Sequence, residues 1–480
     1  TPKPGTRIPH GPERAGRPTD APLPSGNAPP THHRCTTAPT NRTPLRTNPP
    51  RQGIETELTD HPRPAKDDGT AGDKLADGSA TATADPRTDQ DAPATSEVSH
   101  GLRRLPNWAL TLLAIGTLYM LIVAIGVIGD GFKGLGKDAA EGLFDFATNP
   151  FIALFVGVLA TAIIQSSSTT TALVVTAVGA GALPLEVAVP MIMGANIGTS
   201  VTNTLASFGH AGHKDEFRRA FAASTVHDFF NLFAVIILLP LEIFFHPIQR
   251  SAEWVSDQLF GTILPDPGNA DLIGGLTDPA VDLIGMSGLM GMMPGSDVVD
   301  GTLTILVGVA MIFFAVAWLG KILQLIMVGR AKAILEKSVG GHPLTAMGAG
   351  ALVTVLVQSS SVTTSVMVPF AGSGALTTRQ IYPLTLGANV GTTITALIAA
   401  LAVTGDGANL ALTIAIVHTL FNVFGIIIIY GLPFLRELPL TGAEILAKVA
   451  SERKIYAVAW VVTVFLAIPA LAILIKVLFT

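Results

Sequence analysis

The fold is decided by residues 150–206, which read PFIALFVGVLATAIIQSSSTTTALVVTAVGAGALPLEVAVPMIMGANIGTSVTNTLA. This stretch aligns without a gap on residues 343–399, which read PLTAMGAGALVTVLVQSSSVTTSVMVPFAGSGALTTRQIYPLTLGANVGTTITALIA. In this alignment 24 of the 57 positions are identical. A shared bias toward Ala and Leu cannot explain matches at Gln, Asn and runs of Ser at fixed spacing. The chain therefore contains two copies of one unit.

Three polar patterns recur in the two copies. Gln-Ser-Ser-Ser occupies residues 165–168 and 358–361, and Gly-Ala-Asn-x-Gly-Thr occupies residues 194–199 and 387–392. Farther along, a His and an Asn four residues apart recur as His227 with Asn231 and His418 with Asn422. Residues four apart lie on one face of a helix, so each pair points the same way.

The composition predicts a membrane protein. Of the 480 residues, 49% are hydrophobic and 14% are charged, whereas roughly 25% are charged in an average globular domain. Residues 1–104 are rich in Pro, Thr, Arg and Asp, and we expect a disordered polar tail there. The net charge of −5 and the lack of a basic patch with interleaved aromatics give no indication of a nucleic-acid partner. A single cysteine, Cys35, excludes an intrachain disulfide and a cysteine-based metal site.

The hydrophobic pattern predicts an all-α polytopic membrane protein. About 20 apolar residues cross the hydrocarbon core as a helix. The clear spans are residues 106–128, 225–245, 302–328, 410–432 and 456–479, and residues 185–206 and 380–403 are spans interrupted by Gly and Asn. Residues 150–183 and 343–376 are too long for one span and are broken in the middle by Gln, Ser and Thr. We expect each of these two segments to form a re-entrant hairpin of two half-helices.

Loop charges predict the orientation of the spans. Arg103 and Arg104 place the N-terminus in the cytoplasm, and the basic loops around residues 210–219 and 330–337 are also expected inside. The acidic connector before residue 300 is expected outside. The two hairpins then open on opposite sides, so the repeats are inverted. The predicted organisation is a tail (1–104), membrane repeat 1 (105–247), an acidic extracellular connector (248–300), membrane repeat 2 (301–432), and a cytoplasmic linker with a final span (433–480).

The breaks within the hairpins predict a transport site. Inverted repeats with discontinuous helices hold their sites near the midplane, where the two breaks meet. A Ser at the break can cap the second half-helix, whose N-terminus suits phosphate. Hydroxyl and amide oxygens there also suit an alkali cation. Since no Lys or Arg lies within either hairpin, we infer that cations travel with the anion and offset its desolvation.

Some of these residues also have plain structural interpretations. Ser and Thr commonly cap and pack membrane helices, and the glycines of the Gly-Ala-Asn-x-Gly-Thr motifs permit close helix packing. We expect Asn196 and Asn389 to contact the hairpin tips or an ion. The two His–Asn pairs are expected to make hydrogen bonds between helices. Asp228 is a costly carboxylate in an apolar run, so it is either functional or close enough to the cytoplasmic end to be solvated.

These motifs, together with the run from residue 217 to residue 231, resemble the type II sodium–phosphate cotransporter family over about residues 108–479. The resemblance implies a symporter that couples inward Na+ movement to uptake of inorganic phosphate across the plasma membrane, with no cofactor besides the co-transported ion. It implies substrate contacts from Gln165, Ser166, Ser167, Ser168, Gln358, Ser359, Ser360 and Ser361. The Na+ candidates are Thr170, Asn196, Thr199, Thr363, Asn389 and Thr392.

The chain departs from the animal members of this family in two ways. Their outer loop between the repeats is long and cysteine-stapled, whereas the connector here is short and has no cysteine, which indicates a bacterial-type member. Animal members also add a span after the one that matches residues 456–479. This chain stops at Thr480, so by charge tracing we expect its end to lie outside; either the chain is truncated or its last span is arranged differently.

Three other functions fit part of the pattern. The first is a transporter of another anion, which the spacing of the motifs does not exclude and only the family resemblance does. The second is a passive channel, because broken helices also occur in channels. An intramembrane serine hydrolase would use Ser167 with His227 and Asp228. An enzyme needs one such site, however, and the second copy has Thr419 where the first has Asp228. The sequence therefore favours a transporter.

Overall fold

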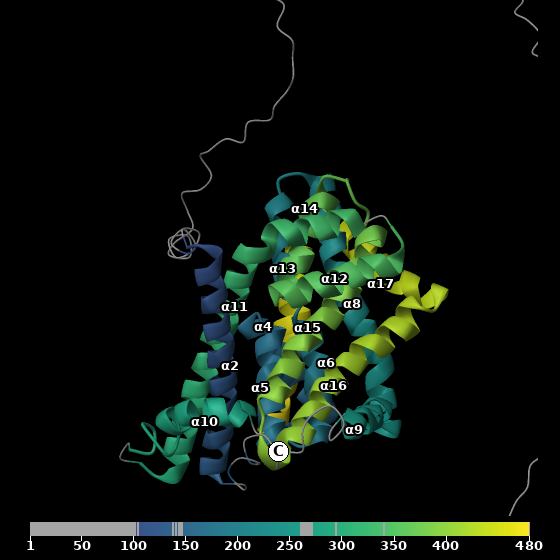
Figure 1. Cartoon of the computed structure of the whole chain (residues 1–480). Coiled ribbons are helices and arrows are strands. Elements are labelled where there is room, and N and C mark those ends of the chain that lie inside the picture. Colours follow the sequence, from purple (N-terminus) through teal and green to yellow (C-terminus); the bar gives the residue numbers. More distant parts are fainter. Residues whose placement is uncertain are drawn as a thin grey trace, which may run out of the picture. The chain divides into compact units, whose positions relative to one another are not determined.

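The structure, a computed structural model, describes residues 102, 105–136, 139, 142, 147–259, 272–292, 295–338 and 341–479. Apart from residue 102, the predicted polar tail lies outside these residues. The described residues form helices and no strand. Six helical stretches are long and apolar enough to cross a membrane: Asn107–Leu135, Lys214–Phe245, Asp297–Met327, Thr378–Leu401, Ala408–Tyr430 and Ile455–Phe479. The prediction of an all-α, multi-pass membrane protein is confirmed (Figure 1).

Each predicted hairpin is a pair of helices joined at a glutamine. In the first, α4 (Pro150–Ile164) ends at Gln165 and α5 (Ser167–Gly179) follows. In the second, α12 (Pro343–Val357) ends at Gln358 and α13 (Ser360–Ser365) follows. The two glutamines have φ of 58° and 54°, in the left-handed region that ends a helix for a non-glycine residue only at some cost. The chain thus breaks at the same position in both copies.

The second arms of the two hairpins differ. In the first copy α5 is one helix of 13 residues. In the second copy the arm is divided at Val366 into α13 and α14 (Met367–Gly372). Pro369 lies within α14, where it has no N–H to donate to Ser365 and its ring crowds that carbonyl. The equivalent residue of the first copy is Thr176, which leaves α5 intact.

The span predicted over residues 185–206 is wrong as a single helix. It forms α6 (Leu185–Gly198) and α7 (Val201–Ser207), whereas its counterpart α15 (Thr378–Leu401) is continuous. The Asn196 carbonyl, which would accept from Ser200 N–H in an uninterrupted helix, instead accepts from Asn231 Nδ2 at 2.8 Å. The Ser200 N–H turns to Ile197 O. A side chain from another helix therefore replaces one rung of the helical ladder.

Glycines let the first arm of each hairpin pack closely on the following helix. A Cβ on Gly157 of α4 would lie 2.0 Å from Met191 O of α6, and a Cβ on Gly194 of α6 would lie 2.0 Å from Leu154 O of α4. The second copy repeats this arrangement between α12 and α15, where Gly350 faces Leu384 O at 2.1 Å and Gly387 faces Met347 O at 1.9 Å. Backbone atoms fill these spaces, so neither pair of helices tolerates a side chain at the contact.

The open ends of the two hairpins lie toward opposite ends of α8 (Lys214–Phe245). At the start of α8, Arg219 donates two hydrogen bonds to the carbonyl of Gly372, the last residue of α14. Gly179, the last residue of α5, instead lies against Gly407 of the 3₁₀ turn η3 (Gly405–Gly407). That turn leads into α16 (Ala408–Gly425), and α16 is bonded near its start to α9 (Pro247–Leu259), which directly follows α8. In Figure 1 α14 lies at the top of the bundle and α5 lies in its lower half.

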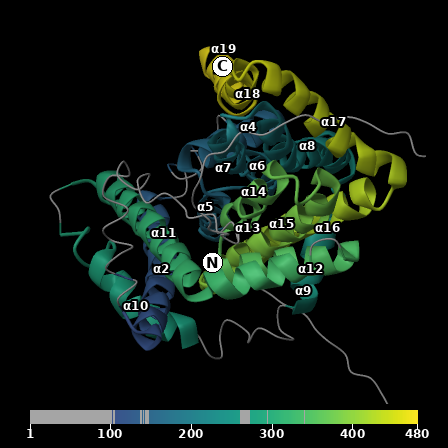
Figure 2. The same ribbon diagram turned by 90° about the horizontal axis from the view of Figure 1, so that it is seen from above.

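The remaining helices flank the hairpins on two sides (Figure 2). On one side α11 (Asp297–Ser338) packs along α2 (Asn107–Leu135), with α10 (Leu272–Ile284) against α2. On the other side are α17 (Pro433–Glu452), α18 (Ile455–Val461), the π-helical turn η5 (Val462–Ala467) and α19 (Ile468–Phe479). Arg379 of α15 holds α17 through Glu437 at 2.8 Å, and its guanidinium lowers the pKa of that carboxyl.

Candidate functional site

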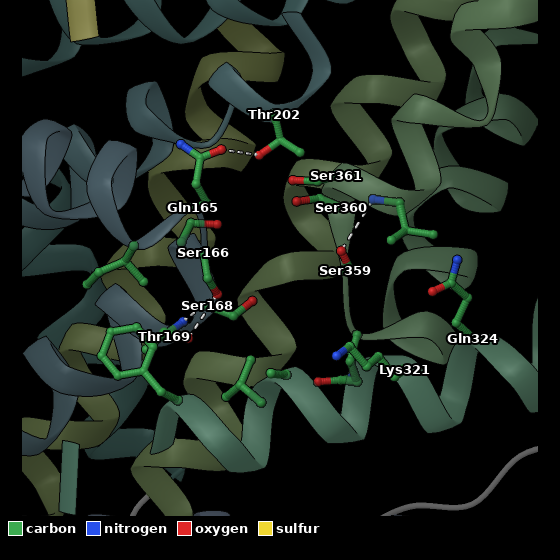
Figure 3. A pocket seen from close by; sticks show the side chains of 18 residues that line it. Gln165, Ser166, Ser168, Thr169, Thr202, Lys321, Gln324, Ser359, Ser360 and Ser361 are labelled. Carbon is green, nitrogen blue, oxygen red and sulfur yellow. Dashed lines mark hydrogen bonds between the residues drawn. The ribbon is translucent and has the colours of Figure 1, made fainter. Parts of the chain in front are cut away.

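The two glutamine–serine turns line a single cavity of about 360 Å³ (Figure 3). All eight predicted substrate residues are among the lining residues, four from each hairpin. Thr169 and Val362, which occupy equivalent positions in the two copies, also line it. The structure thus places together two motifs that lie 193 residues apart in the chain. Their contact with substrate stays a prediction.

Each glutamine is held at both ends of its side-chain amide. Gln165 Nε2 donates to Ala162 O of its own helix, and Gln165 Oε1 accepts from Thr202 Oγ1 of α7 at 3.0 Å. In the second copy Gln358 Nε2 donates to Val355 O at 2.7 Å, and Gln358 Oε1 accepts from Thr395 Oγ1 of α15 at 2.9 Å. The amide fastens the left-handed turn to α7 in the first copy and to α15 in the second. We call these two contacts the glutamine clamps.

The first serine of each motif is a helix cap. Ser166 Oγ accepts from Thr169 N at 3.2 Å, and Ser359 Oγ accepts from Val362 N at 3.3 Å. Both serines have extended backbone, with φ of −151° and −154°, as expected for an N-cap residue. The capping that the sequence predicted is therefore made by the first serine alone.

The second and third serines carry the available hydroxyls. Within the described part of the chain, the side chains of Ser167, Ser168, Ser360 and Ser361 make no hydrogen bond, although all four line the cavity. Ser167 and Ser168 are the first two residues of α5, where backbone N–H groups have no partner within the helix. This end of the cavity therefore offers hydroxyls and a helix N-terminus to an anion.

A third element, α11, closes the cavity with one face of its helix. The lining residues from α11 are spaced as a single helical stripe: Phe313, Val316, Ala317, Gly320, Lys321 and Gln324. Figure 3 shows Lys321 and Gln324 on α11 across from the serines of the second tip. Among the described residues that line the cavity, Lys321 is the only charged one and none is a carboxylate. The two polar residues of α11 that line the cavity, Lys321 and Gln324, were not among the residues predicted from the sequence.

The threonine candidates for Na+ lie behind the tips and bond to their own helices. Thr170 Oγ1 donates to Ser166 O, and Thr363 Oγ1 donates to Ser359 O while accepting from Thr354. Thr199 and Thr392 donate to the carbonyls four residues earlier. None of these four threonines lines the cavity. Their role as Na+ ligands stays a prediction.

Asn196 and Asn389 join a chain of buried hydrogen bonds between the two copies. His227 Nε2 is bonded to Asn389 Oδ1, and Asn389 Nδ2 donates to Asn231 Oδ1 at 2.9 Å. Asn231 Nδ2 in turn donates to Asn196 O. Reciprocally, Asn196 Oδ1 accepts from Asn422 Nδ2 at 3.2 Å and lies 3.4 Å from His418 Nε2. We call this chain the His–Asn brace.

The brace bears on the prediction that the two His–Asn pairs make hydrogen bonds between helices. Each His–Asn pair bonds the Asn of the other copy, so the expected hydrogen bonds between helices are confirmed. Neither Asn196 nor Asn389 lines the cavity of the hairpin tips. Their binding of an ion stays a prediction.

Asp228 and His227 point to different partners. Asp228 Oδ2 accepts from Trp460 Nε1 at 3.0 Å and lies 3.4 Å from Thr204 Oγ1. The carboxylate is buried, with 2% of its surface exposed, so it is not solvated as one interpretation expected. His227 is bonded to Asn389, and no bond of either residue to Ser167 occurs among the described residues. A hydrolase triad is therefore not assembled here.

Three of the missed residues had a signal in the sequence. Thr202 and Thr395 are an identical pair at the 193-residue offset, so the repeat alignment marks them as equivalent. Lys321 is the only charged residue between Asp300 and Arg330, in an otherwise apolar span. An ionisable residue within a span is a functional candidate by default. Gln324, by contrast, carries no comparable signal.

Comparison with known proteins gives matches to one family. A family model described as Na+/Pi-cotransporter matches residues 120–253 and 311–432, which cover most of the two predicted repeats. Sodium-dependent phosphate transport protein 2B of Pongo abelii is 30% identical over 445 residues, which cover 75% of this chain and 64% of the relative. Transport protein 2A of Oryctolagus cuniculus is 32% identical over 442 residues, which cover 77% of this chain and 68% of the relative.

The chain thus spans a little under two-thirds of the length of the 2B relative. No solved structure matches the chain.

Proposed function

Because the chain belongs to the Na+/Pi-cotransporter family, we propose that it is a secondary active symporter that couples inward Na+ movement to the uptake of inorganic phosphate. The names of its relatives, sodium-dependent phosphate transport proteins 2A and 2B, support this substrate and this ion. Na+ is then a transported ion and no cofactor is required. The bacterial-type assignment stays a prediction.

The observation that carries the proposal is the single cavity lined by both glutamine–serine tips. Ser167, Ser168, Ser360 and Ser361 have hydroxyls free to donate to phosphate oxygens, and Ser167 opens helix α5 with unbonded N–H groups. In this proposal the glutamines and the first serines do not bind phosphate but hold the tips in place. The substrate set predicted from sequence is thereby divided into four ligands and four positioning residues.

In this proposal Na+ balances the part of the phosphate charge that the lining of the site does not balance. Phosphate carries between one and two negative charges near neutral pH, and the described residues of the lining include one cation and no acid. Co-transported Na+ supplies the remaining positive charge and lowers the cost of desolvating the anion. Oxygen atoms of the threonines behind the tips, such as Thr170 and Thr363, are the kind of hard ligand that Na+ takes.

We further propose that the two repeats are inverted and lie in the plasma membrane with the N-terminus in the cytoplasm. The loop charges support this orientation. The contacts Gly372–Arg219 and Gly179–Gly407 support it independently, because they place the open ends of the hairpins toward opposite ends of α8. One hairpin opening to each side would give the substrate access from either side in turn.

The transport proposal is tested by radiolabelled phosphate flux into proteoliposomes. We expect uptake under an inward Na+ gradient and little uptake when K+ replaces Na+. Equal flux in the two conditions would refute sodium coupling and favour a passive channel. If sulfate or a carboxylate is taken up under the Na+ gradient and phosphate is not, the substrate is another anion.

The orientation proposal is tested by single-cysteine labelling in a Cys35→Ser background. Cysteines in place of His210 and Gly405 lie near the open ends of hairpins 2 and 1 respectively. We expect an impermeant thiol reagent to reach position 210 only from the cytoplasmic side and position 405 only from the outside. Labelling of both positions from the same side would contradict inverted repeats.

A further inference from the structure

Lys321 has no partner for its charge. Within the described residues, its ammonium group makes no hydrogen bond and no ion pair, and its side chain is exposed to the cavity. Along α11 it lies nine residues before Arg330, which corresponds to about 13 Å of helix. An unpaired cation at this depth in a membrane span is costly. An anion in the space in front of the ammonium group would offset this cost.

The surroundings of Lys321 fit such an anion. The hydroxyls of Ser168 and Ser360 line the same cavity, and Figure 3 shows Lys321 on the α11 side of the space between the two tips. The described residues of the lining include no Asp or Glu that would compete for the ammonium group. Lysine binds phosphate oxygens as a point charge, and a bond between two charged groups is about twice as strong as a neutral one.

We propose that Lys321 supplies the fixed positive charge of the phosphate site, with the anion held between α11 and the two hairpin tips. This inference rests on the proposed transport of phosphate. It assigns substrate selection to a helix outside both hairpins. A phosphate bound there contacts three elements at once: the first tip, the second tip and α11. The bound anion therefore links the α2–α11 pair to both hairpins.

The first test replaces the charge and measures Na+-dependent phosphate uptake in proteoliposomes. We expect Lys321→Met to raise the phosphate concentration for half-maximal uptake by about 10- to 150-fold, because a hydrogen bond to a charged group is lost. Lys321→Arg keeps the charge and should remain closer to the unmodified protein. The matched control is Lys337→Met, on the exposed surface of the same helix outside the cavity. Equal half-saturation in Lys321→Met and Lys337→Met would overturn the inference.

A second test needs no substitution, so it holds even if Lys321 variants do not fold. The solubilised full chain is treated with an amine-acylating reagent, and modification of Lys321 and Lys337 is followed by mass spectrometry. Inorganic phosphate with Na+ should slow acylation of Lys321 and leave Lys337 unchanged. If the unmodified chain shows Na+-dependent uptake but phosphate does not protect Lys321, the inference fails and the transport proposal stands. If the unmodified chain shows no such uptake, the transport proposal itself fails.

Discussion

The two hairpins have the same tip and different arms. In both copies a glutamine adopts the left-handed conformation, a threonine 37 residues later clamps it, and the first serine caps the next helix. Beyond the tip, α5 is continuous, whereas Pro369 divides the second arm into α13 and α14. Both copies keep the tip that lines the cavity and the close contacts of the first arm. Only the second arms differ.

The hydrogen bonds behind the tips show a second difference. In the second copy Thr354 Oγ1 donates to Thr363 Oγ1 at 3.0 Å, which ties the first arm to the second. The equivalent hydroxyl of the first copy, on Thr161, is buried without a partner among the described residues. The first hairpin is thus less constrained behind its tip, although its second arm is the more regular helix. Equivalent substitutions in the two copies can therefore separate the function of the tip from that of the arms.

The largest effect is expected where the copies are most alike, at the close helix contacts. Gly194→Ala and Gly387→Ala place a Cβ about 2 Å from a backbone carbonyl. Overpacking of this kind costs about 3 kcal/mol or more where the backbone cannot move. We expect both variants to lose most of the folded protein in the membrane, as measured by size-exclusion chromatography of the solubilised chain.

The matched control for the glycine variants is Gly116→Ala, which has open space where its Cβ would lie. It should be indistinguishable from the unmodified protein. Loss of folding in one of the two repeat variants alone would show that the helix contacts of the two copies are not equivalent.

The next effect concerns the glutamine clamps. Gln165→Ala and Gln358→Ala remove the amide that holds each tip and leave the threonine hydroxyl unbonded. An unsatisfied polar group costs roughly 1–3 kcal/mol, so we expect phosphate affinity to fall about 5- to 150-fold while the protein still reaches the membrane. Phosphate uptake under a Na+ gradient gives the measurement.

Thr202→Val and Thr395→Val distinguish a positioning role from direct binding of the substrate. If each glutamine acts through its threonine, combining Gln165→Ala with Thr202→Val should cost little more than Gln165→Ala alone. Additive losses would mean that Gln165 contacts phosphate itself. The same pair of variants in the second copy, at Gln358 and Thr395, repeats the test.

The smallest effect is expected at the His–Asn brace, which lies away from the cavity. His227→Ala and His418→Ala each remove one hydrogen bond between the copies, and such bonds are worth about 1 kcal/mol in membrane proteins. His418 is the more distant from its partner, at 3.4 Å, so its loss should lower thermal stability less than the loss of His227. Half-saturating phosphate should change in neither variant. A rise in half-saturating phosphate with unchanged stability would place the brace in the binding site.

The arrangement of the tips could be predicted from the sequence because it follows from two local signals. The polar break in an apolar segment marks the turn, and duplication of the break at a fixed offset indicates one shared site. The division at Val366 was also predictable in principle, since Pro369 cannot donate the helical hydrogen bond to Ser365.

Other features depend on contacts between distant elements and have no local signal. The break between α6 and α7 requires Asn231 to reach the carbonyl of Asn196. The roles of Gln165 and Gln358 as clamps require threonines on another helix. Lys321 was visible as a lone charge in an apolar span, but its place at the cavity depends on how α11 packs against the two hairpins.

We propose that one phosphate site is built from both hairpin tips. It is tested most directly by single cysteines at the equivalent positions Thr169→Cys and Val362→Cys, which line the cavity without belonging to the proposed ligands. The measurement is the rate of thiol modification in the solubilised Cys35→Ser chain, with an exposed control cysteine at His213. At ten times the half-protecting phosphate concentration, with Na+ present, both cavity cysteines should react about tenfold more slowly. We expect the same half-protecting concentration for both positions, and no protection when K+ replaces Na+. Protection of one cysteine alone would contradict a shared site.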